Sequence, residues 1–397
     1  MHAQPRPHLI AMYLPQYHPI PENDEWWEPG FTEWTNVTKA SPLFHGHRQP
    51  HLPADLGFYD LRVPEVRAAQ AEMAQAHGIS AFCYWHYWFA GRRLLERPFN
   101  EVLTSGEPRF PFCLAWANQD WYGNPYRLLL RQTYPGIQDH TAHFHTLLKA
   151  FTDDRYLTVD GKPLLYLYKP TLLPDSKRVT DLWRELAHRA GLKGLHLVGE
   201  APPSWNPTAS GFDAAVTVAL PRRLDDFSLR HPWRTLRSLR RRITGRPTVY
   251  KYSKILHTLL IDSLPGVLSH PCLIPNWDNT PRWGVEGMVL QGSTPEAFRI
   301  HVKQALMRAH AAPPTERIIF IKSWNEWAEG NYLEPDREFG SRYLQVLSEE
   351  LDRYQPFPAV QPPHVSLNGT IDARRAHADA SREPAANDTA SHPQARR

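Results

Sequence analysis

Short, nearly continuous apolar runs recur along the chain, and longer segments of mixed polarity separate them. Because apolar and polar residues do not alternate within these runs, they are typical of parallel strands buried on both faces. We predict strands at residues 9–14, 79–85, 112–116, 164–168, 195–199, 215–219, 273–276 and 317–322.

Between these runs the apolar residues return at helical spacing. In the first such segment Val63, Val66, Ala69 and Met73 share one helical face, and Gly78 is suited to end the helix. We predict helices at residues 63–77, 92–106, 140–151, 177–190, 250–262, 295–311 and 341–354.

Strands that alternate with helices predict an α/β fold, and the eight predicted strands favour closure into a (β/α)8 TIM-type barrel. We assign residues 1–355 to this single catalytic domain. The alternative is a doubly wound sheet, which would carry a glycine-rich phosphate-binding turn after its first strand. Residues 13–19 read Tyr-Leu-Pro-Gln-Tyr-His-Pro, without glycine, and neither a Gly-x-Gly-x-x-Gly nor a P-loop sequence occurs anywhere. The barrel is therefore favoured.

Composition adds a hint about the ligand and the compartment. The 14 Trp are many for a chain of 397 residues, and flat indole rings suit the apolar faces of sugars. Neither a secretory signal nor an apolar run long enough to span a membrane is visible. Cys83, Cys113 and Cys272 are far apart and lack Cys-x-x-Cys spacing, which favours reduced core thiols. We expect a cytoplasmic protein.

Aromatic and polar residues follow most of the predicted strands. Barrel enzymes place their chemistry at the carboxyl ends of the strands. Sugar sites combine aromatic platforms with amides and acids that bind hydroxyls. The pattern predicts a polyol-binding face, with candidate substrate-binding residues Tyr13, Gln16, Tyr17, His18, Glu33, Trp34, Trp85, His86, Trp116, Asn118, Tyr168, Lys169, Glu200, Asn276, Trp277, Asp278, Trp324, Asn325 and Trp327.

Glu326 and Glu329 form a Glu-x-x-Glu pair just after the last predicted strand. If the chain turns helically there, the two side chains lie on one side, with Cβ atoms about 5–6 Å apart. Retaining glycosidases hold their two carboxyl groups about 5–5.5 Å apart, so the spacing permits such a pair. The alternative is a solvated helix face, against which the flanking Trp324, Trp327 and Gly330 speak.

Two blocks of sequence carry a family resemblance. Residues 324–330, Trp-Asn-Glu-Trp-Ala-Glu-Gly, followed by Glu334 and Pro335, resemble the catalytic stretch of glycoside hydrolase family 99, the endo-acting α-mannosidases. The N-terminal block resembles the WbsX-type proteins of bacterial surface polysaccharide loci, which are labelled glycosyltransferases and share that barrel. It comprises residues 13–19, 30–37, 42–44, 49–50 and 52–57. The resemblance spans residues 9–354.

The resemblance implies a role for each carboxylate. Glu326 corresponds to the residue thought to act as a base on the sugar 2-hydroxyl, which gives a 1,2-anhydro sugar intermediate. Glu329 corresponds to the general acid/base on the leaving oxygen. An acid that works at neutral pH needs a raised pKa, which neighbouring Trp side chains and a second carboxylate can supply. The resemblance also implies a role in cell-surface polysaccharide (O-antigen or lipopolysaccharide) metabolism, without a cofactor.

A basic insertion, residues 221–248, follows the sixth predicted strand. From Arg222 to Arg246 there are nine Arg against two Asp. Residues 232–243 have the pattern of a basic amphipathic helix, of the kind that lies on anionic membranes. One interpretation is a solvated surface insertion. A second is contact with the inner face of a membrane or with a phosphate-bearing, lipid-linked glycan. A third is nucleic-acid binding, which no recognised motif supports.

Residues 356–397 lack apolar periodicity, so we predict a disordered tail there.

Three function classes stay open. The first is a retaining glycosidase-type enzyme that cleaves, or transfers from, an α-linked glycan. The second is a nucleotide-sugar glycosyltransferase, although the Asp-x-Asp sequence of many metal-dependent transferases is missing. The third is a non-catalytic glycan binder, against which the intact carboxylate pair speaks. His45-x-His47 and His143-x-His145 lack a matching acid cluster, so we predict no metal site.

Overall fold

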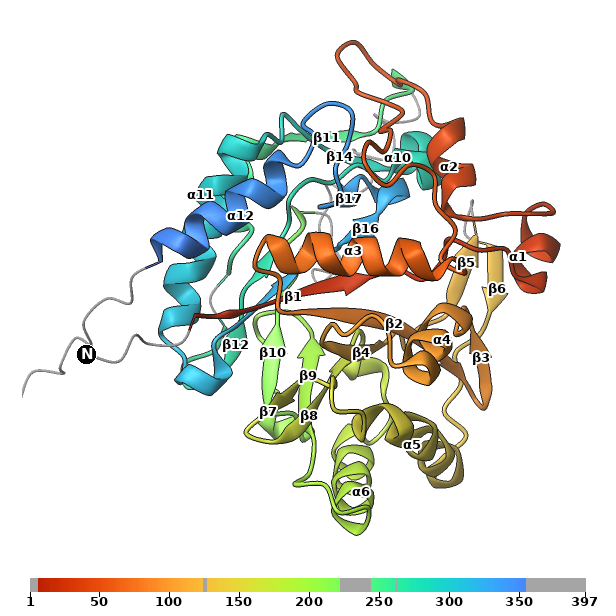
Figure 1. Cartoon of the computed structure of the whole chain (residues 1–397), viewed down its shortest axis with the longest axis vertical. Helices are drawn as coiled ribbons and strands as arrows, with labels where there is room; N and C mark the ends of the chain where they lie inside the picture. The colour runs from red at the N-terminus through yellow and green to blue at the C-terminus, as the bar shows by residue number, and fades with distance from the viewer. Residues whose placement is uncertain (1–5, 124–126, 222–243, 262, 355–397) are drawn as a thin grey trace, which may run out of the picture. The chain divides into compact units, whose positions relative to one another are not determined.

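The computed structural model describes residues 6–123, 127–221, 244–261 and 263–354 (Figure 1). Most of the basic insertion, including the amphipathic segment 232–243, lies outside the described residues, and so does the tail 356–397.

Within the described ranges, eight parallel strands form a nearly closed barrel, which confirms the predicted fold class. Each strand pairs with its neighbours in chain order, and the last barrel strand returns to pair with the first. Around the ring they are β1 (His8–Tyr13), β2 (Ala81–Phe89), β4 (Phe112–Trp116), β8 (Lys162–Leu167), β9 (His196–Glu200), β10 (Ala214–Val216), the interrupted pair β12 (Ser269–His270) and β13 (Cys272–Leu273), and β15 (Ile318–Ile321).

The seventh strand differs from its prediction at residues 273–276. Its first part, β12, pairs with β10, and its second part, β13, pairs with β15. Pro271 separates the two parts, because proline has no N–H to donate to a ladder. The strand ends at Leu273, and the N–H of Ile274 instead donates to the His301 ring.

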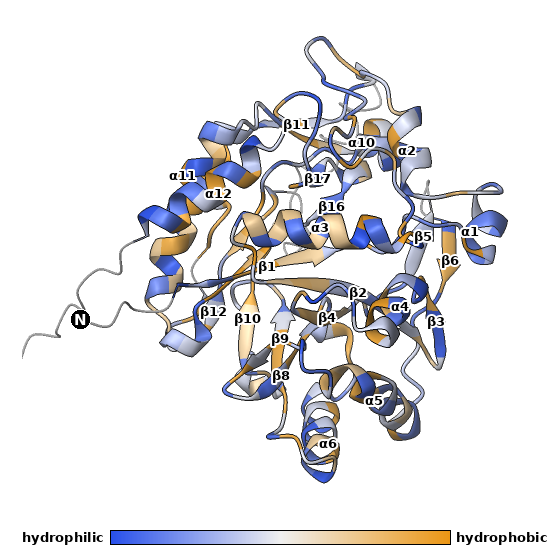
Figure 2. Cartoon of the chain, in the orientation of Figure 1, coloured by the Kyte–Doolittle hydropathy of each residue, from blue (hydrophilic) through white to orange (hydrophobic). Residues whose placement is uncertain are grey.

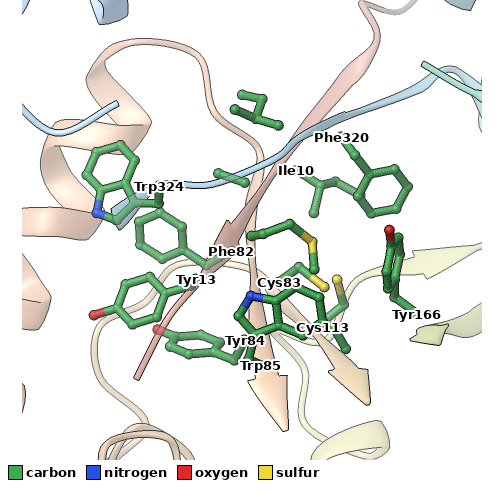
Figure 3. Close-up of a cluster of buried hydrophobic side chains, with 14 of the residues drawn as sticks. Ile10, Tyr13, Phe82, Cys83, Tyr84, Trp85, Cys113, Tyr166, Phe320 and Trp324 are labelled. Carbon is green, nitrogen blue, oxygen red and sulfur yellow. The ribbon is translucent and has the colours of Figure 1, made fainter. Parts of the chain in front are cut away.

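The barrel strands lie in the apolar runs of the sequence, because the side chains of these runs are buried on both faces of the sheet. Every residue of β2 and β4 is buried. Their side chains join those of β1 and β15 in one hydrophobic cluster, in which Cys83 and Cys113 lie side by side (Figure 3). Figure 2 shows hydrophobic strands within and hydrophilic residues on the surrounding helices. All three cysteines are buried free thiols.

Six of the helices that we predicted are present in the described residues, with ends shifted by a few residues. Two predictions were wrong in part. Residues 92–94 form strand β3 (Arg92–Leu94) against β2, and the helix begins at Arg97. Residues 248–251 form β11 (Thr248–Lys251), paired with β14 (Met288–Gln291), so only a short helical turn follows. The confirmed helices are α3 (Pro64–Ala76), α4 (Arg97–Ser105), α5 (Ile137–Phe151), α6 (Ser176–Arg189), α11 (Pro295–His310) and α12 (Arg342–Arg353).

Further short elements complete the described fold. The helices are α1 (Pro21–Trp26), α2 (Glu33–Lys39), α9 (Tyr252–Ile255) and α10 (Thr280–Trp283). The strands are β5 (Trp121–Gly123), β6 (Arg127–Leu130), β7 (Thr158–Val159), β16 (Asn325–Glu326) and β17 (Asn331–Tyr332). Single 3₁₀ turns occur at Pro170–Leu172, Thr208–Ser210, Leu256–Thr258, Gly284–Glu286, Pro314–Glu316 and Trp327–Glu329.

Asn325 joins the segment that follows the first barrel strand to the segment that follows the last one. Its side-chain oxygen accepts the N–H of Leu14 at 2.7 Å, and its side-chain nitrogen donates to the Leu14 carbonyl at 3.0 Å. The segment after β15 is therefore fixed against the segment after β1.

Candidate active site

A cavity of about 700 Å³ opens at the carboxyl ends of the barrel strands, since Leu14, Ala117, Tyr168 and Lys322, which follow four of them, contribute to its wall. This volume suits a ligand of several rings. The other lining residues are mostly aromatic or polar: Gln16, Asn23, Trp26, Trp27, Phe31, Asn36, Trp85, Tyr87, Gln119, Asp120, Trp121, Tyr122, Leu129, Arg282, Trp283, Glu326 and Glu329.

Glu326 and Glu329 reach this cavity from one tight turn. Glu326 ends β16, and residues Trp327–Glu329 form a single 3₁₀ turn. Gly330 follows in the left-handed region with φ of +51°, and a Cβ there would lie 2.8 Å from the backbone nitrogen of Asp278. That nitrogen donates to the Glu329 carbonyl at 2.7 Å. Position 330 therefore requires glycine, and the hydrogen bond from the Asp278 N–H fixes the turn.

Arg282 of α10 binds both carboxylates at once. One terminal nitrogen of its guanidinium lies 2.9 Å from a Glu326 oxygen, and the other lies 2.9 Å from a Glu329 oxygen. The nitrogen that contacts Glu326 also lies 2.5 Å from Glu33. Glu33 is fully buried and accepts the N–H of Ala328 at 3.1 Å. The planar guanidinium of Arg282 thus holds the carboxylates of Glu33, Glu326 and Glu329 close together.

The cluster carries three carboxylates and one guanidinium. Burial raises the pKa of Glu326 to about 7, and the negative charges of Glu329 and Glu33 add to this, although Arg282 and Lys322 oppose it. Burial likewise raises the pKa of Glu33. Burial disfavours the Arg282 cation, but the three carboxylates outweigh it and raise its pKa well above the ordinary value. The guanidinium therefore stays charged while Glu326 can exchange a proton near neutral pH.

Glu334 supports the turn from beneath. Its carboxylate accepts hydrogen bonds from the Trp327 indole at 2.6 Å, the Gln70 amide at 2.6 Å and the Tyr59 hydroxyl at 2.8 Å. Burial raises its pKa to about 7, although these donors oppose the rise. Tyr332 stacks on Trp327 with ring centroids 3.9 Å apart. Trp327, which separates the two cavity carboxylates in sequence, is therefore held on both sides.

The structure divides the predicted substrate-binding residues into three groups. Gln16, Trp85 and Tyr168 line the cavity, and Glu33 lies behind it against Arg282. A second cavity is lined by Asn276, Trp277 and Asp278. The remaining candidates do not line either cavity and instead build the frame: Tyr13, Tyr17, His18, Trp34, His86, Trp116, Asn118, Lys169, Glu200, Trp324, Asn325 and Trp327.

The frame residues nearest the turn pack and bond among themselves. Tyr13 donates to Gln70 at 2.6 Å, and Tyr17 donates to the Asn325 carbonyl. The Trp34 indole packs 5.5 Å from the Trp327 ring. These contacts connect the first strand with the carboxylate turn.

The other frame residues serve the remaining strand ends. His86 stacks on His143, and Trp116 is buried beside it. The Asn118 side chain bonds both backbone groups of Lys169, at 2.8 and 2.7 Å. Glu200 accepts the Tyr166 hydroxyl at 2.7 Å. His18 is buried and contacts the Pro15 carbonyl, and Trp324 packs on Phe82.

Residues 9–347 match the model of a protein family described as glycosyltransferase WbsX. The chain belongs to the WbsX glycosyltransferase family. This confirms the resemblance to WbsX-type proteins seen in the N-terminal block.

This WbsX family chain is also similar to curated relatives. Two proteins named "Uncharacterized protein WxcX", from two strains of Xanthomonas campestris pv. campestris, are each 38% identical to it, over 356 and 363 residues. The matches cover 87% of this chain and 50% of each relative. The chain therefore spans about half the length of the curated relatives it matches.

Solved structures share its fold. A glycoside hydrolase-like protein superposes with a TM-score of 0.56 at 15% identity, covering 88% of this chain and 95% of the other. An endo-α-mannosidase of glycoside hydrolase family 99 from Bacteroides thetaiotaomicron gives a TM-score of 0.50 at 14% identity, with 87% and 96% covered. These likenesses establish the fold that the WbsX family chain adopts.

Sequence reasoning missed Arg282 and most of the aromatic wall. Arg282 follows the seventh strand by nine residues and belongs to no recognised motif, so nothing in the sequence set it apart. Trp26 and Trp27 lie on and just after α1, away from any strand end. Trp121 and Tyr87 do follow predicted strand ends, so the pattern used for the other candidates could have included them.

The described residues lack two features. Across residues 6–354 with their gaps, no group of three His, Cys, Asp or Glu side chains is placed to hold a metal ion. Among the helices that the structure describes, none is both long enough and apolar enough to cross a membrane.

Proposed function

We propose that the chain is a carbohydrate-active enzyme that acts on α-linked glycans with retaining, glycosidase-type chemistry. One observation carries the proposal: Glu326 and Glu329 face the same aromatic-lined cavity and share the guanidinium of Arg282. The surrounding aromatic rings suit the apolar faces of sugars, and the amides of Gln16, Asn36 and Gln119 suit their hydroxyls.

Glu326 is the proposed base. In the first step its carboxylate takes the proton of the sugar 2-hydroxyl, and the 2-oxygen bonds to the anomeric carbon. The glycosidic bond breaks, and protonated Glu329 gives its proton to the leaving oxygen. In the second step Glu329 takes a proton from water or another sugar hydroxyl, whose oxygen bonds to the anomeric carbon. The bond between the anomeric carbon and the 2-oxygen breaks, and Glu326 returns its proton to the 2-oxygen. The pKa of Glu326, raised to about 7 by burial, suits a base at neutral pH.

Arg282 balances charge during this exchange. Before the first step Glu326 is negative and Glu329 is neutral, and afterwards the reverse holds. The guanidinium bonds both at 2.9 Å, so the negative charge moves from one of its partners to the other. A fixed cation between them stabilises both states without rearrangement.

A nucleotide-sugar glycosyltransferase is the second candidate, since the family is described as glycosyltransferase WbsX. The charge of the cavity argues against a diphosphate there. Arg282 is already shared among three carboxylates, and Asp120 adds a further acid to the wall, so these four acids outnumber the two cations, Arg282 and Lys322. Bringing phosphate charges to this excess of carboxylates would be unfavourable.

The cellular role is part of the proposal. We place the enzyme in bacterial surface polysaccharide metabolism, in the cytoplasm, on the resemblance of its motifs to WbsX-type proteins. The glycan is lipid-linked in this scheme, and the basic segment 232–243 would meet the membrane. Liposome co-sedimentation tests this part alone: equal partitioning of the wild type and an Arg-to-Ser variant of the segment would contradict it.

Product analysis tests the chemistry. Candidate surface glycans are incubated with the chain, with and without nucleotide sugars, and the released or elongated products are identified. Turnover without a nucleotide sugar supports the proposal, and strict dependence on one supports the second candidate.

Variants identify the carboxylates. Glu326→Gln and Glu329→Gln should each lower turnover by about 10²–10⁴-fold, the usual contribution of acid–base groups. Glu72→Gln, on the exposed side of α3, is the matched control and should keep wild-type turnover. Near-wild-type activity of either site variant would remove that residue from the mechanism.

A further inference from the structure

A second cavity, of about 430 Å³, is lined by residues of β11, β14 and β17 and of the loops beside them. These strands are labelled in the upper part of Figure 1. Asn276, Trp277, Gln291, Tyr332 and Phe339 contribute to its wall. The proposed chemistry uses none of these residues. Its size is within the range of small-molecule sites.

The two cavities lie on opposite sides of one segment. Glu329 lines the first cavity, and its neighbour Gly330 lines the second. Asp278, which also lines the second, bonds through its backbone N–H to the Glu329 carbonyl at 2.7 Å. The segment that carries Glu329, a proposed catalytic residue, therefore contributes to both cavities.

Charged groups of both signs line the second cavity, and several of them contact one another. The His47 ring contacts Asp278 at 2.6 Å, and Arg48 pairs with Glu338. Asp336 accepts the Tyr332 hydroxyl at 2.7 Å. Lys251, an exposed cation, also contributes to the lining. Because acids and bases both line the cavity and neither sign is concentrated, a neutral molecule is favoured over a phosphate or a carboxylate.

Hydrogen bonds hold the Asp278 side chain in place between the two cavities. Burial opposes its ionisation, but hydrogen bonds from His47, Thr280 and Gln49 outweigh burial and lower its pKa. These three donors approach at 2.6, 2.6 and 2.8 Å, so the side chain cannot swing away. The cavity is thus built by a rigid, buried network.

Trp277 and its surroundings supply the chemistry of a sugar site. The Trp277 side chain is 6% exposed, and its indole N–H has no hydrogen-bond partner within the described part of the chain. Phe339 is half-buried and offers an aromatic face, while Asn276 and Gln291 offer amides. Aromatic faces beside amides are the pairing that recognises neutral hydroxyl-rich rings.

We infer that this cavity is a second carbohydrate-binding site, for a neutral pyranose unit, placed back to back with the carboxylate cavity. The inference rests on the proposed function only in taking the ligand to be a sugar, and it requires no turnover. A glycan unit bound there contacts the rear of the segment that carries Glu329.

Binding is measured on the full chain carrying both Glu326→Gln and Glu329→Gln, so that no probe is consumed. The probes are neutral methyl hexopyranosides and their α-linked disaccharides, with a methyl glucuronoside as the anionic comparison. Saturation-transfer NMR and calorimetry give the affinity. Ser253→Trp fills the second cavity from its exposed side, and Lys254→Trp, the next residue of α9 and not part of the wall, is the matched control.

We expect a neutral probe to bind, and Ser253→Trp to weaken this binding by about tenfold or more by exclusion while Lys254→Trp leaves it unchanged. Unchanged binding in Ser253→Trp, equal loss in both α9 variants, or no binding of any neutral probe would overturn the inference. The turnover of Glu326→Gln and Glu329→Gln alone is a separate readout. If those variants stay active, the catalytic proposal fails while the binding result stands.

Discussion

Arg282 carries one positive charge that three carboxylates share, and this arrangement controls the protonation of Glu326. Burial, Glu329 and Glu33 all raise the pKa of Glu326, and Arg282 is the main group that lowers it. The value near 7 is thus a balance between large opposing effects, so a change of one neighbouring residue should move it measurably.

The pH dependence of kcat/KM tests this balance. A base must be ionised, so kcat/KM should rise as pH increases through about 7, the pKa of Glu326. Arg282→Gln removes the cation that lowers this pKa and should shift the acid limb to higher pH. Arg282→Lys keeps the charge and should shift it less. If the acid limb of the Arg282→Gln profile does not move, the group that titrates in this limb is not Glu326.

Stability should respond to pH through the same group. Because the pKa of Glu326 is raised in the folded state, its stabilising contribution is present below the unfolded pKa of about 4.5 and is lost as pH rises through about 7. Glu326→Gln removes this loss. The free energy of unfolding of the variant, relative to that of the wild type, should therefore be higher at pH 8 than at pH 5. Urea denaturation at both pH values measures the difference. A pH-independent difference between Glu326→Gln and the wild type would contradict the raised pKa.

At the scale of elements, the sequence predicted those that local pattern determines. Apolar runs located the barrel strands, and helical spacing located α3, α5, α6, α11 and α12. The errors occur where pairing with a strand elsewhere in the chain determines the secondary structure. Residues 248–251 form a strand because β14, about 40 residues later, pairs with them. Residues 92–94 form a strand because they fold back on β2. Periodicity within a short window cannot register such partners.

The carboxylate turn gives a prediction at this scale. Gly330→Ala should lower both stability and activity, because the left-handed φ costs about 1–2 kcal/mol and overlap with Asp278 adds roughly 1–3 kcal/mol. Gly340 has a similar φ of +54° but open space around its Cβ position, so Gly340→Ala should cost only the backbone part. Thermal unfolding and turnover of the two variants are compared. Equal losses would show that contact with Asp278 does not matter.

At the scale of the whole described fold, the site joins segments that are far apart in sequence. Glu33, Arg282 and Glu326 meet at one guanidinium although nearly 300 residues separate the first from the last. The sequence marked the two glutamates of the motif, since a short stretch contains both. It could not mark Arg282, because its role depends on where the loop after β13 approaches the turn.

Asn325 is the link on which this assembly depends. Asn325→Ala would leave the N–H and the carbonyl of Leu14 buried without partners, at a cost of about 2–4 kcal/mol. We expect a lower midpoint of unfolding and a loss of turnover, because the side-chain link between the segments after β1 and β15 would be lost. Asn100→Ala, which removes a part-buried bond to Arg93, is the comparison. Similar stability of both variants would mean that the link is dispensable.

The pairing of β1 with both β2 and β15 has a consequence for synthesis on the ribosome. One edge of β1 finds its partner about 70 residues later, but the other edge waits for residues 318–321. At about 5–20 residues per second, that wait lasts roughly 15–60 seconds. During this time the nascent chain exposes an apolar strand edge, which other strands can join. The earliest segment of the fold is therefore the one that most needs protection by chaperones until the carboxylate motif emerges.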